Sequence, residues 1–118
     1  MTLNEIIKIL NCSVLVGEEN LNNEVKAGCG CDLMSDVLAF IKPSAMLLTG
    51  LNHPQVIRTA EISDIKVICF VRGKKPSEEV IALARENGIT LLTSSLPMFE
   101  ACGKLYESGL MGCSELRE

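Results

Sequence analysis

The chain has 118 residues, with 11 basic and 15 acidic side chains and a net charge of −4. This length predicts one domain, and an apolar content of 47% excludes a disordered chain because it supplies enough aliphatic material for a core. Aromatic residues make up only 3% of the acidic chain, which argues against nucleic-acid binding, since that function needs basic stripes or stacking rings.

The first predicted elements are a helix and two short strands. Apolar residues recur at helical spacing up to Leu10, and Thr2 with Glu5 has the pattern of a capping box. A strand is predicted at Ser13–Val16 and a weaker one at residues 24–31. Two glycines, at positions 28 and 30, interrupt the second strand and indicate a bulge or a close approach of another segment to the backbone.

From residue 35 onwards, short apolar runs alternate with helical patterns. The predicted strands are Ala45–Thr49, 66–71 and 89–93, and the predicted helices are 35–41, 54–61, 77–87 and 96–107. Ser35 is expected to cap the first of these helices, and Ser94 with Ser95 the last. Apolar strands separated by helices are typical of a parallel sheet that is buried on both faces. The sequence therefore predicts an α/β fold, a single compact domain with a mostly parallel sheet flanked by helices.

The domain is expected to span residues 1–118, with its core at 3–110 and a frayed tail at 111–118. The first residues do not resemble a signal peptide, and no apolar run approaches the ~20 residues that cross a bilayer. We therefore expect a cytoplasmic protein without a membrane partner. In that compartment its six cysteines are expected to be reduced thiols rather than disulfides.

Several segments of the chain, from about Leu3 to Leu110, resemble the DRTGG domain family. They are residues 47–51, 56–64, 72–76, 84–89, 98–100 and 103–110. The resemblance implies a small α/β module, similar to the N-terminal domain of HPr kinase, that has no assigned catalytic residues and contributes to subunit contacts and regulation. It also implies a stand-alone member of the kind that accompanies iron-hydrogenase genes. Asn52-His53-Pro54 departs from the pattern, because many relatives have Gly-Asp-Arg there.

The residues that follow the three apolar strands form a candidate ligand site. In an open parallel sheet, ligands bind beyond the carboxyl ends of the strands, and helix N-termini there favour anions. The candidate binding residues are Thr49, Gly50, Asn52, Arg72, Gly73, Lys74, Thr93 and Ser94. Arg72 and Lys74 would add cationic donors, which favours a nucleotide or another phosphate-bearing effector. The alternative is that these glycines only make turns and that Asn52 and Ser95 only cap helices.

Cys29 and Cys31 have a spacing that permits a metal site, because residues i and i+2 of a strand point to the same face. A complete zinc or iron–sulfur site usually needs four soft ligands, and the other cysteines are scattered along the chain. Free cysteines often pack as small hydrophobic residues, and we expect Cys69 to do so. His53 is expected to be a polar residue at a helix start rather than a general base.

The leading interpretation is a non-catalytic regulatory or interaction module, a homodimer without a cofactor, that binds a small anionic ligand. The alternative is an accessory protein of an iron-hydrogenase system, with hydrogenase subunits as partners and a metal or iron–sulfur cluster held by Cys29 and Cys31. An enzyme is not predicted, because no nucleophile is paired with a base and no pair of carboxylates, such as Asp32 with Asp36, has a spacing that suggests cooperation.

Overall fold

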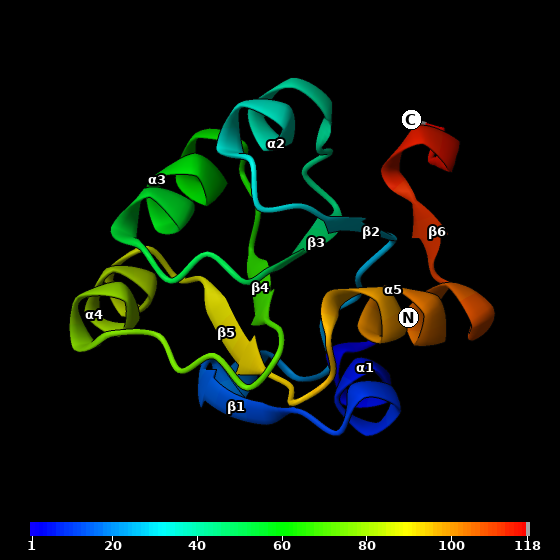
Figure 1. The fold of residues 1–118 in the computed structure, drawn as a ribbon, viewed down its shortest axis with the longest axis horizontal. Coiled ribbons are helices and arrows are strands. Elements are labelled where there is room, and N and C mark those ends of the chain that lie inside the picture. The colour runs from blue at the N-terminus through cyan, green and yellow to red at the C-terminus, as the bar shows by residue number, and fades with distance from the viewer. Residues whose placement is uncertain (118) are drawn as a thin grey trace.

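The structure, a computed structural model, describes residues 1–117, so the last residue of the predicted tail, Glu118, lies outside the described residues. Six strands form one sheet in the order β1-β5-β4-β3-β2-β6 (Figure 1). All neighbouring strands are parallel except β1 and β5, which are antiparallel. The strands are β1 (Ser13–Val16), β2 (Ala27–Gly30), β3 (Ala45–Thr49), β4 (Val67–Phe70), β5 (Thr90–Thr93) and β6 (Met111–Gly112).

Helices cover both faces of this sheet. They are α1 (Leu3–Leu10), α2 (Met34–Phe40), α3 (Pro54–Ile62), α4 (Glu78–Glu86) and α5 (Met98–Glu107), with short 3-10 turns at Glu18–Asn20 and Cys113–Glu115. Figure 1 shows α2, α3 and α4 on one side of the sheet and α1 with α5 on the other. The predicted α/β fold with a mostly parallel sheet is therefore confirmed. Within residues 1–117, no helix combines the length and the apolarity needed to cross a bilayer.

Two hydrophobic cores lie on the two faces of the sheet, and β3 shows how one strand supplies both. All five of its residues are buried. Leu47 packs into the core beneath α2, α3 and α4, whereas Met46 and Leu48 pack into the core beneath α1 and α5. Alternate residues of a strand point to opposite faces, so an uninterrupted apolar run is the pattern that a doubly covered strand requires.

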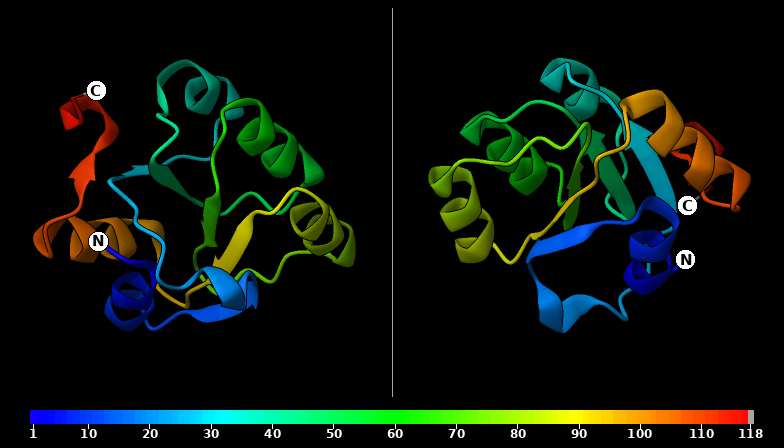
Figure 2. Two further views of the ribbon diagram at one scale, coloured as in Figure 1. Left: turned by 180° about the vertical axis from the view of Figure 1, so that it is seen from behind. Right: turned by 60° about the horizontal axis from the view of Figure 1, so that its bottom comes forward.

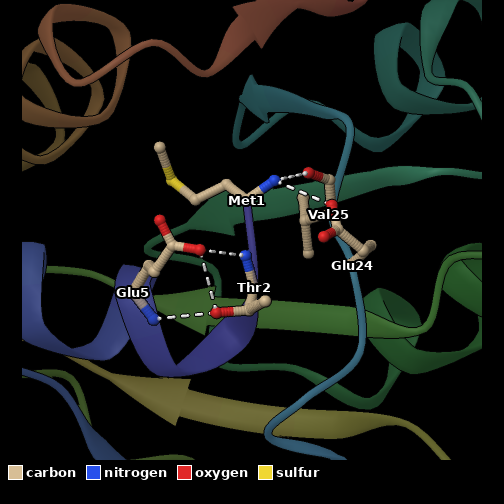
Figure 3. Close-up of polar contacts among 5 residues, drawn as sticks. All are labelled: Met1, Thr2, Glu5, Glu24 and Val25. Carbon is tan, nitrogen blue, oxygen red and sulfur yellow. Dashed lines mark hydrogen bonds and ion pairs between the residues drawn. The ribbon is translucent and has the colours of Figure 1, made fainter.

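The capping box predicted at the start of α1 is present (Figure 3). The backbone N–H of Glu5 donates to the Thr2 hydroxyl at 3.3 Å, and the Thr2 N–H donates to the Glu5 carboxylate at 3.2 Å. The hydrogen bond from the Thr2 backbone N–H lowers the pKa of the Glu5 carboxyl most, and a hydrogen bond from the Thr2 hydroxyl lowers it further. The amino group of Met1 pairs with Glu24 at 2.9 Å beside this cap, which brings α1 against the segment that leads into β2.

Two predicted helix caps are wrong. Helix α2 begins at Met34, one residue before Ser35, and Leu33 occupies the cap position without a side-chain hydrogen bond. Helix α5 begins at Met98 after Pro97, so Ser94 and Ser95 do not cap it. The Ser94 hydroxyl is buried and donates to the carbonyl oxygen of Leu10 at 2.8 Å, because α1 packs on this end of the sheet. The Ser94 hydroxyl, which the local sequence predicts as a helix cap, is therefore used in a tertiary hydrogen bond to Leu10 instead.

The expected frayed tail is also corrected for its first residues. Met111 and Gly112 form β6, which pairs in parallel with β2 and covers what would otherwise be the edge of the sheet. Figure 2 shows this segment, coloured red, at the margin of the sheet beside β2. The Lys42 ammonium group also donates to the carbonyl oxygen of Leu116. Backbone groups of β2 that need partners explain why so short a segment is a strand.

Candidate functional site

The three loops predicted to bind a ligand meet at one end of the sheet. Strands β3, β4 and β5 are parallel and in register, so that Thr49 lies beside Phe70 and Phe70 lies beside Thr93. The three strands therefore end side by side, and the loops that follow them begin next to one another. This register brings the candidate residues at the ends of β3, β4 and β5 to a single edge, as the sequence predicted.

Hydrogen bonds join these loops to one another. The Thr93 hydroxyl donates to the Lys74 carbonyl oxygen at 3.0 Å, and the Gly73 N–H donates to the Ser94 carbonyl oxygen at 2.8 Å. The Asn52 side chain donates to the Lys75 carbonyl oxygen and accepts from a backbone N–H at the start of α4, both at 3.1 Å. Asn52 therefore bridges two loops, and it does not cap the helix that follows it.

His53 takes the cap position of α3, as expected. Its ring nitrogen Nδ1 accepts a hydrogen bond from the Gln55 N–H at 3.0 Å. Helix α3 has no acidic residue in its first turn, whereas α4 has Glu78 and Glu79 there. Carboxylates in a first turn already balance the positive end of a helix dipole. The start of α3 is therefore the more favourable of these two helix N-termini for an external anion.

The turn after β4 presents the cationic side chains. Arg72 and Gly73 both have left-handed backbone conformations, with φ of 60° and 66°. The Arg72 N–H donates to the Leu96 carbonyl oxygen at 2.7 Å, which helps to hold a conformation that non-glycine residues adopt at a cost. Arg72, Lys74 and Lys75 are all exposed. The turn therefore presents three exposed cationic side chains to an anion at this edge of the sheet.

Asp32, which sequence reasoning did not place at this edge, occupies part of it. Its oxygen Oδ1 accepts from the Thr49 hydroxyl at 2.8 Å and from the Gly50 N–H at 2.7 Å. Asp32 follows β2, which is parallel to β3, so the rule that gathers strand ends could have found it. The carboxylate satisfies the buried hydroxyl of Thr49 and accepts from the Gly50 N–H, so these groups of two predicted binding residues are already engaged within the chain.

The two described cavities lie away from these loops. One, of about 350 Å³, lies between α5 and the β2–β6 edge and is lined mainly by apolar side chains and by Gly28, Gly30, Gly103 and Gly112. Here α5 packs so closely on β2 that a Cβ atom at Gly30 would lie only 2.6 Å from the Cys102 sulfur. The other, of about 490 Å³, opens at the amino ends of the strands. The candidate anion site is therefore a surface made by loops rather than either of these cavities.

The cysteines considered as metal ligands lie on one side of the sheet. Cys29 and Cys31 are half-buried and pack against the same core, as their spacing predicted. Burial, and then the neighbouring thiols of Cys113, Cys31 and Cys102, raise the pKa of Cys29 to about 11. A metal would have to displace that proton, since the thiolate is the ligand. Within residues 1–117, no three His, Cys, Asp or Glu side chains are placed together to hold a metal ion.

Comparisons with known proteins agree with the fold. The family model described as the DRTGG domain matches residues 5–108. No curated protein matches the sequence. Among solved structures, the chain is similar to the CBS and DRTGG domains of the regulatory region of Clostridium perfringens pyrophosphatase, in complex with the activator diadenosine tetraphosphate. The TM-score is 0.73 at 19% identity, over 99% of this chain and 50% of that one, so this chain spans about half the length of that structure.

Proposed function

This chain belongs to the DRTGG domain family, and we propose that it is a non-catalytic regulatory module that binds a phosphate-bearing ligand, such as a nucleotide, at the loops after β3, β4 and β5. The observation that carries this proposal is the shared register of Thr49, Phe70 and Thr93, which brings these loops together. Exposed Arg72 and Lys74 supply positive charge there. The activator bound by the similar pyrophosphatase region is a nucleotide with four phosphates, which supports this class of ligand.

The ligand is expected to approach the start of α3 and the turn after β4. Helix α3 begins at the same edge as Arg72 and Lys74, so the positive end of its dipole and the two cationic side chains favour the same anion. The hydroxyl of Thr93 is engaged with the Lys74 carbonyl oxygen, so it fixes the turn rather than facing the ligand. A change in that turn on binding would be transmitted to β5 and to α4, which is how a module without catalytic residues can report a ligand.

A second copy of this chain is part of the proposal as the expected partner. Phe99, Tyr106 and Met111 are exposed apolar residues at the rim of the cavity beside α5. Large exposed apolar groups that gather in one place often mark a surface for association. Sedimentation of the purified chain as a dimer supports this part, and a monomer at micromolar concentration contradicts it. The cytoplasmic location and the iron-hydrogenase context stay predictions from the sequence.

The binding proposal is tested by calorimetry with diadenosine tetraphosphate, ATP and inorganic phosphate. We expect the double substitution of Arg72 and Lys74 by alanine to weaken nucleotide binding by at least about tenfold, which corresponds to about 1.4 kcal/mol. The matched control is Lys26→Ala, which removes an exposed lysine just before β2, at the opposite end of the parallel strands. Equal affinity in the double variant and the control, or no binding to the unmodified chain, contradicts the proposal.

A second prediction concerns the carboxylate of Asp32. Asp32→Asn keeps an oxygen that can accept from Thr49 and Gly50 but removes a negative charge from the site. Like charges about 4 Å apart repel by about 1–4 kcal/mol near a protein surface, so we expect nucleotide affinity to rise by about tenfold. The matched control is Asp64→Asn, which removes a carboxylate whose partner is Lys66 at 3.1 Å, away from the three loops. A fall in affinity for Asp32→Asn would show that the carboxylate assists binding.

A further inference from the structure

Two of the six cysteines place their sulfur atoms in contact. Cys12 directly precedes β1, and Cys69 lies in β4, 57 positions further along the chain, yet their sulfur atoms are 3.9 Å apart. We propose that Cys12 and Cys69 form an oxidation site, at which a peroxide converts the two thiols into a disulfide. This inference is independent of the ligand site and stands on the geometry of the thiol pair.

The two thiols differ in access to solvent. Cys69 is completely buried in the core beneath α1 and α5, whereas Cys12 is half-buried at the border of that core. A hydrogen bond between the two thiols lowers the pKa of Cys12 and is the largest cause of a raised pKa at Cys69. The thiolate is the nucleophilic form of cysteine. Cys12 is therefore the thiol that reacts with the oxidant, and Cys69 is the thiol that then forms the disulfide with it.

The chemistry balances with one molecule of hydrogen peroxide. The Cys12 thiolate attacks one peroxide oxygen, the O–O bond breaks, and hydroxide leaves as Cys12 becomes a sulfenic acid. The Cys69 sulfur then attacks the Cys12 sulfur, and the hydroxyl group leaves as water with the Cys69 proton. The two thiols lose two electrons and two protons in total, and the peroxide becomes two molecules of water.

Oxidation of Cys12 removes one of the interactions that raise the pKa of Cys69. The hydrogen bond to Cys12 and the negative charge of its thiolate both raise the pKa of Cys69, in addition to burial. Oxidation of Cys12 to a neutral sulfenic acid ends the contribution of that charge. Cys69 consequently becomes a better nucleophile at the moment when its partner becomes an electrophile.

Of the two cysteines, Cys12 is the one outside the strands of the sheet. A disulfide bond is about 2.05 Å long, so the sulfur atoms must move closer by about 2 Å. Cys69 is fixed between two neighbouring strands, but Cys12 lies in the connection between α1 and the edge strand β1. The residue before it, Asn11, ends α1 in the left-handed conformation, with φ of 53°. The movement therefore falls on a loop rather than on the centre of the sheet.

Other cysteines of similar exposure have different neighbours. The Cys31 thiol donates to the Leu33 carbonyl oxygen at 3.4 Å, and the Cys102 thiol donates to the sulfur of Met98 at 3.7 Å. Both residues lie near the Cys29 thiol, whose pKa they raise, but their own hydrogen bonds are made to a carbonyl oxygen and to a thioether rather than to a cysteine. Selectivity for Cys12 and Cys69 thus rests on the 3.9 Å contact of their sulfur atoms, since the five cysteines other than Cys69 are all half-buried.

The test treats the reduced, folded chain with one equivalent of hydrogen peroxide, alkylates the remaining thiols in denaturant and maps the peptides by mass spectrometry. We expect the first product to have lost two hydrogen atoms and to contain a reducible cross-link between the peptides of Cys12 and Cys69. Alkylation of both residues while other cysteines are oxidised would overturn the proposal, as would a first product in which Cys12 is cross-linked elsewhere.

Substitutions separate the two roles. Cys12→Ser, at a half-buried position, should abolish the cross-link and leave Cys69 as a free thiol. The control Cys31→Ser changes another half-buried cysteine and should leave the yield of the cross-link unchanged. Cys69→Ala should accumulate sulfenic acid at Cys12, detected with a trapping dione, if circular dichroism shows that it folds. Equal oxidation of Cys69 in the Cys12→Ser variant and in the unmodified chain would contradict the proposed order of steps.

Discussion

Replacing Phe70 with alanine should lower the free energy of unfolding by about 3–5 kcal/mol. Phe70 is completely buried at the end of β4, where it packs into the core beneath α2, α3 and α4. Truncation removes apolar contacts and leaves a cavity that a sheet covered on both faces cannot easily close. Domains of this size are stable by only about 5–15 kcal/mol, so the loss is a large share of the total.

Urea denaturation followed by circular dichroism measures this loss, and the chain supplies a matched control. Phe40 is 71% exposed at the end of α2, away from the proposed dimer surface, so Phe40→Ala makes the same chemical change with little loss of packing. We expect the control to change the free energy of unfolding by less than about 0.5 kcal/mol. Similar losses in both variants would mean that the core does not lie where the structure places it. Because Phe70 is in register with Thr49 and Thr93, its loss should also weaken ligand binding.

The second large effect is expected at Gly17, which follows β1. Its backbone is left-handed, with φ of 98°, and a Cβ atom there would lie 2.5 Å from the Thr90 hydroxyl oxygen. Gly17→Ala therefore combines backbone strain of about 1–2 kcal/mol with overpacking of about 1–3 kcal/mol. We expect the free energy of unfolding to fall by about 2–5 kcal/mol in the same denaturation experiment.

Gly88 allows the two causes to be separated. It has a similar left-handed conformation, with φ of 66°, but a Cβ atom there would meet nothing within 4 Å. Gly88→Ala should show the backbone strain alone, so its cost is expected to be about 1–2 kcal/mol. If the two alanine variants lose the same free energy of unfolding, the close contact with Thr90 does not contribute to the cost of Gly17→Ala.

Much of the fold follows from local patterns because the central strands obey one simple rule. The apolar run at residues 45–48 requires cover on both faces, and the helices between the strands provide it. Helix ends with a local signal were also predictable. Thr2 caps α1, as its capping box predicts, and Ser77, the first residue of the predicted helix 77–87, is the cap of α4 and accepts from the Val80 N–H at 3.3 Å. These features depend on residues close together in the sequence.

The features that sequence reasoning missed depend on contacts between distant segments. Ser94 has the side chain of a cap, but its hydroxyl bonds to Leu10, 84 positions away. Strand β6 is only two residues long, and it exists because β2 offers unpaired backbone groups at the sheet edge. Neither contact leaves a signal in the local pattern, so composition and periodicity predicted a cap and a tail instead.

The candidate site divides in the same way. The rule that parallel strands end at one edge was enough to bring Thr49, Arg72 and Thr93 together. Asp32 also follows a parallel strand and accepts from the Gly50 N–H, but the two glycines that weaken β2 as a sequence pattern kept it out of the predicted site. The contact of Cys12 with Cys69 was equally hidden, since it joins the end of α1 to a central strand.

The central claim, that a phosphate-bearing ligand binds at the loops after β3, β4 and β5, is tested most directly by NMR. Amide chemical shifts are followed while diadenosine tetraphosphate or ATP is added to the isotope-labelled chain. We predict that the N–H signals of Gly50, Gly73 and Ser94 shift most, because these residues lie at the edge where the three loops meet. Largest shifts at Gly28, Gly103 and Gly112, around the cavity beside α5, would contradict the account, as would a spectrum that does not change.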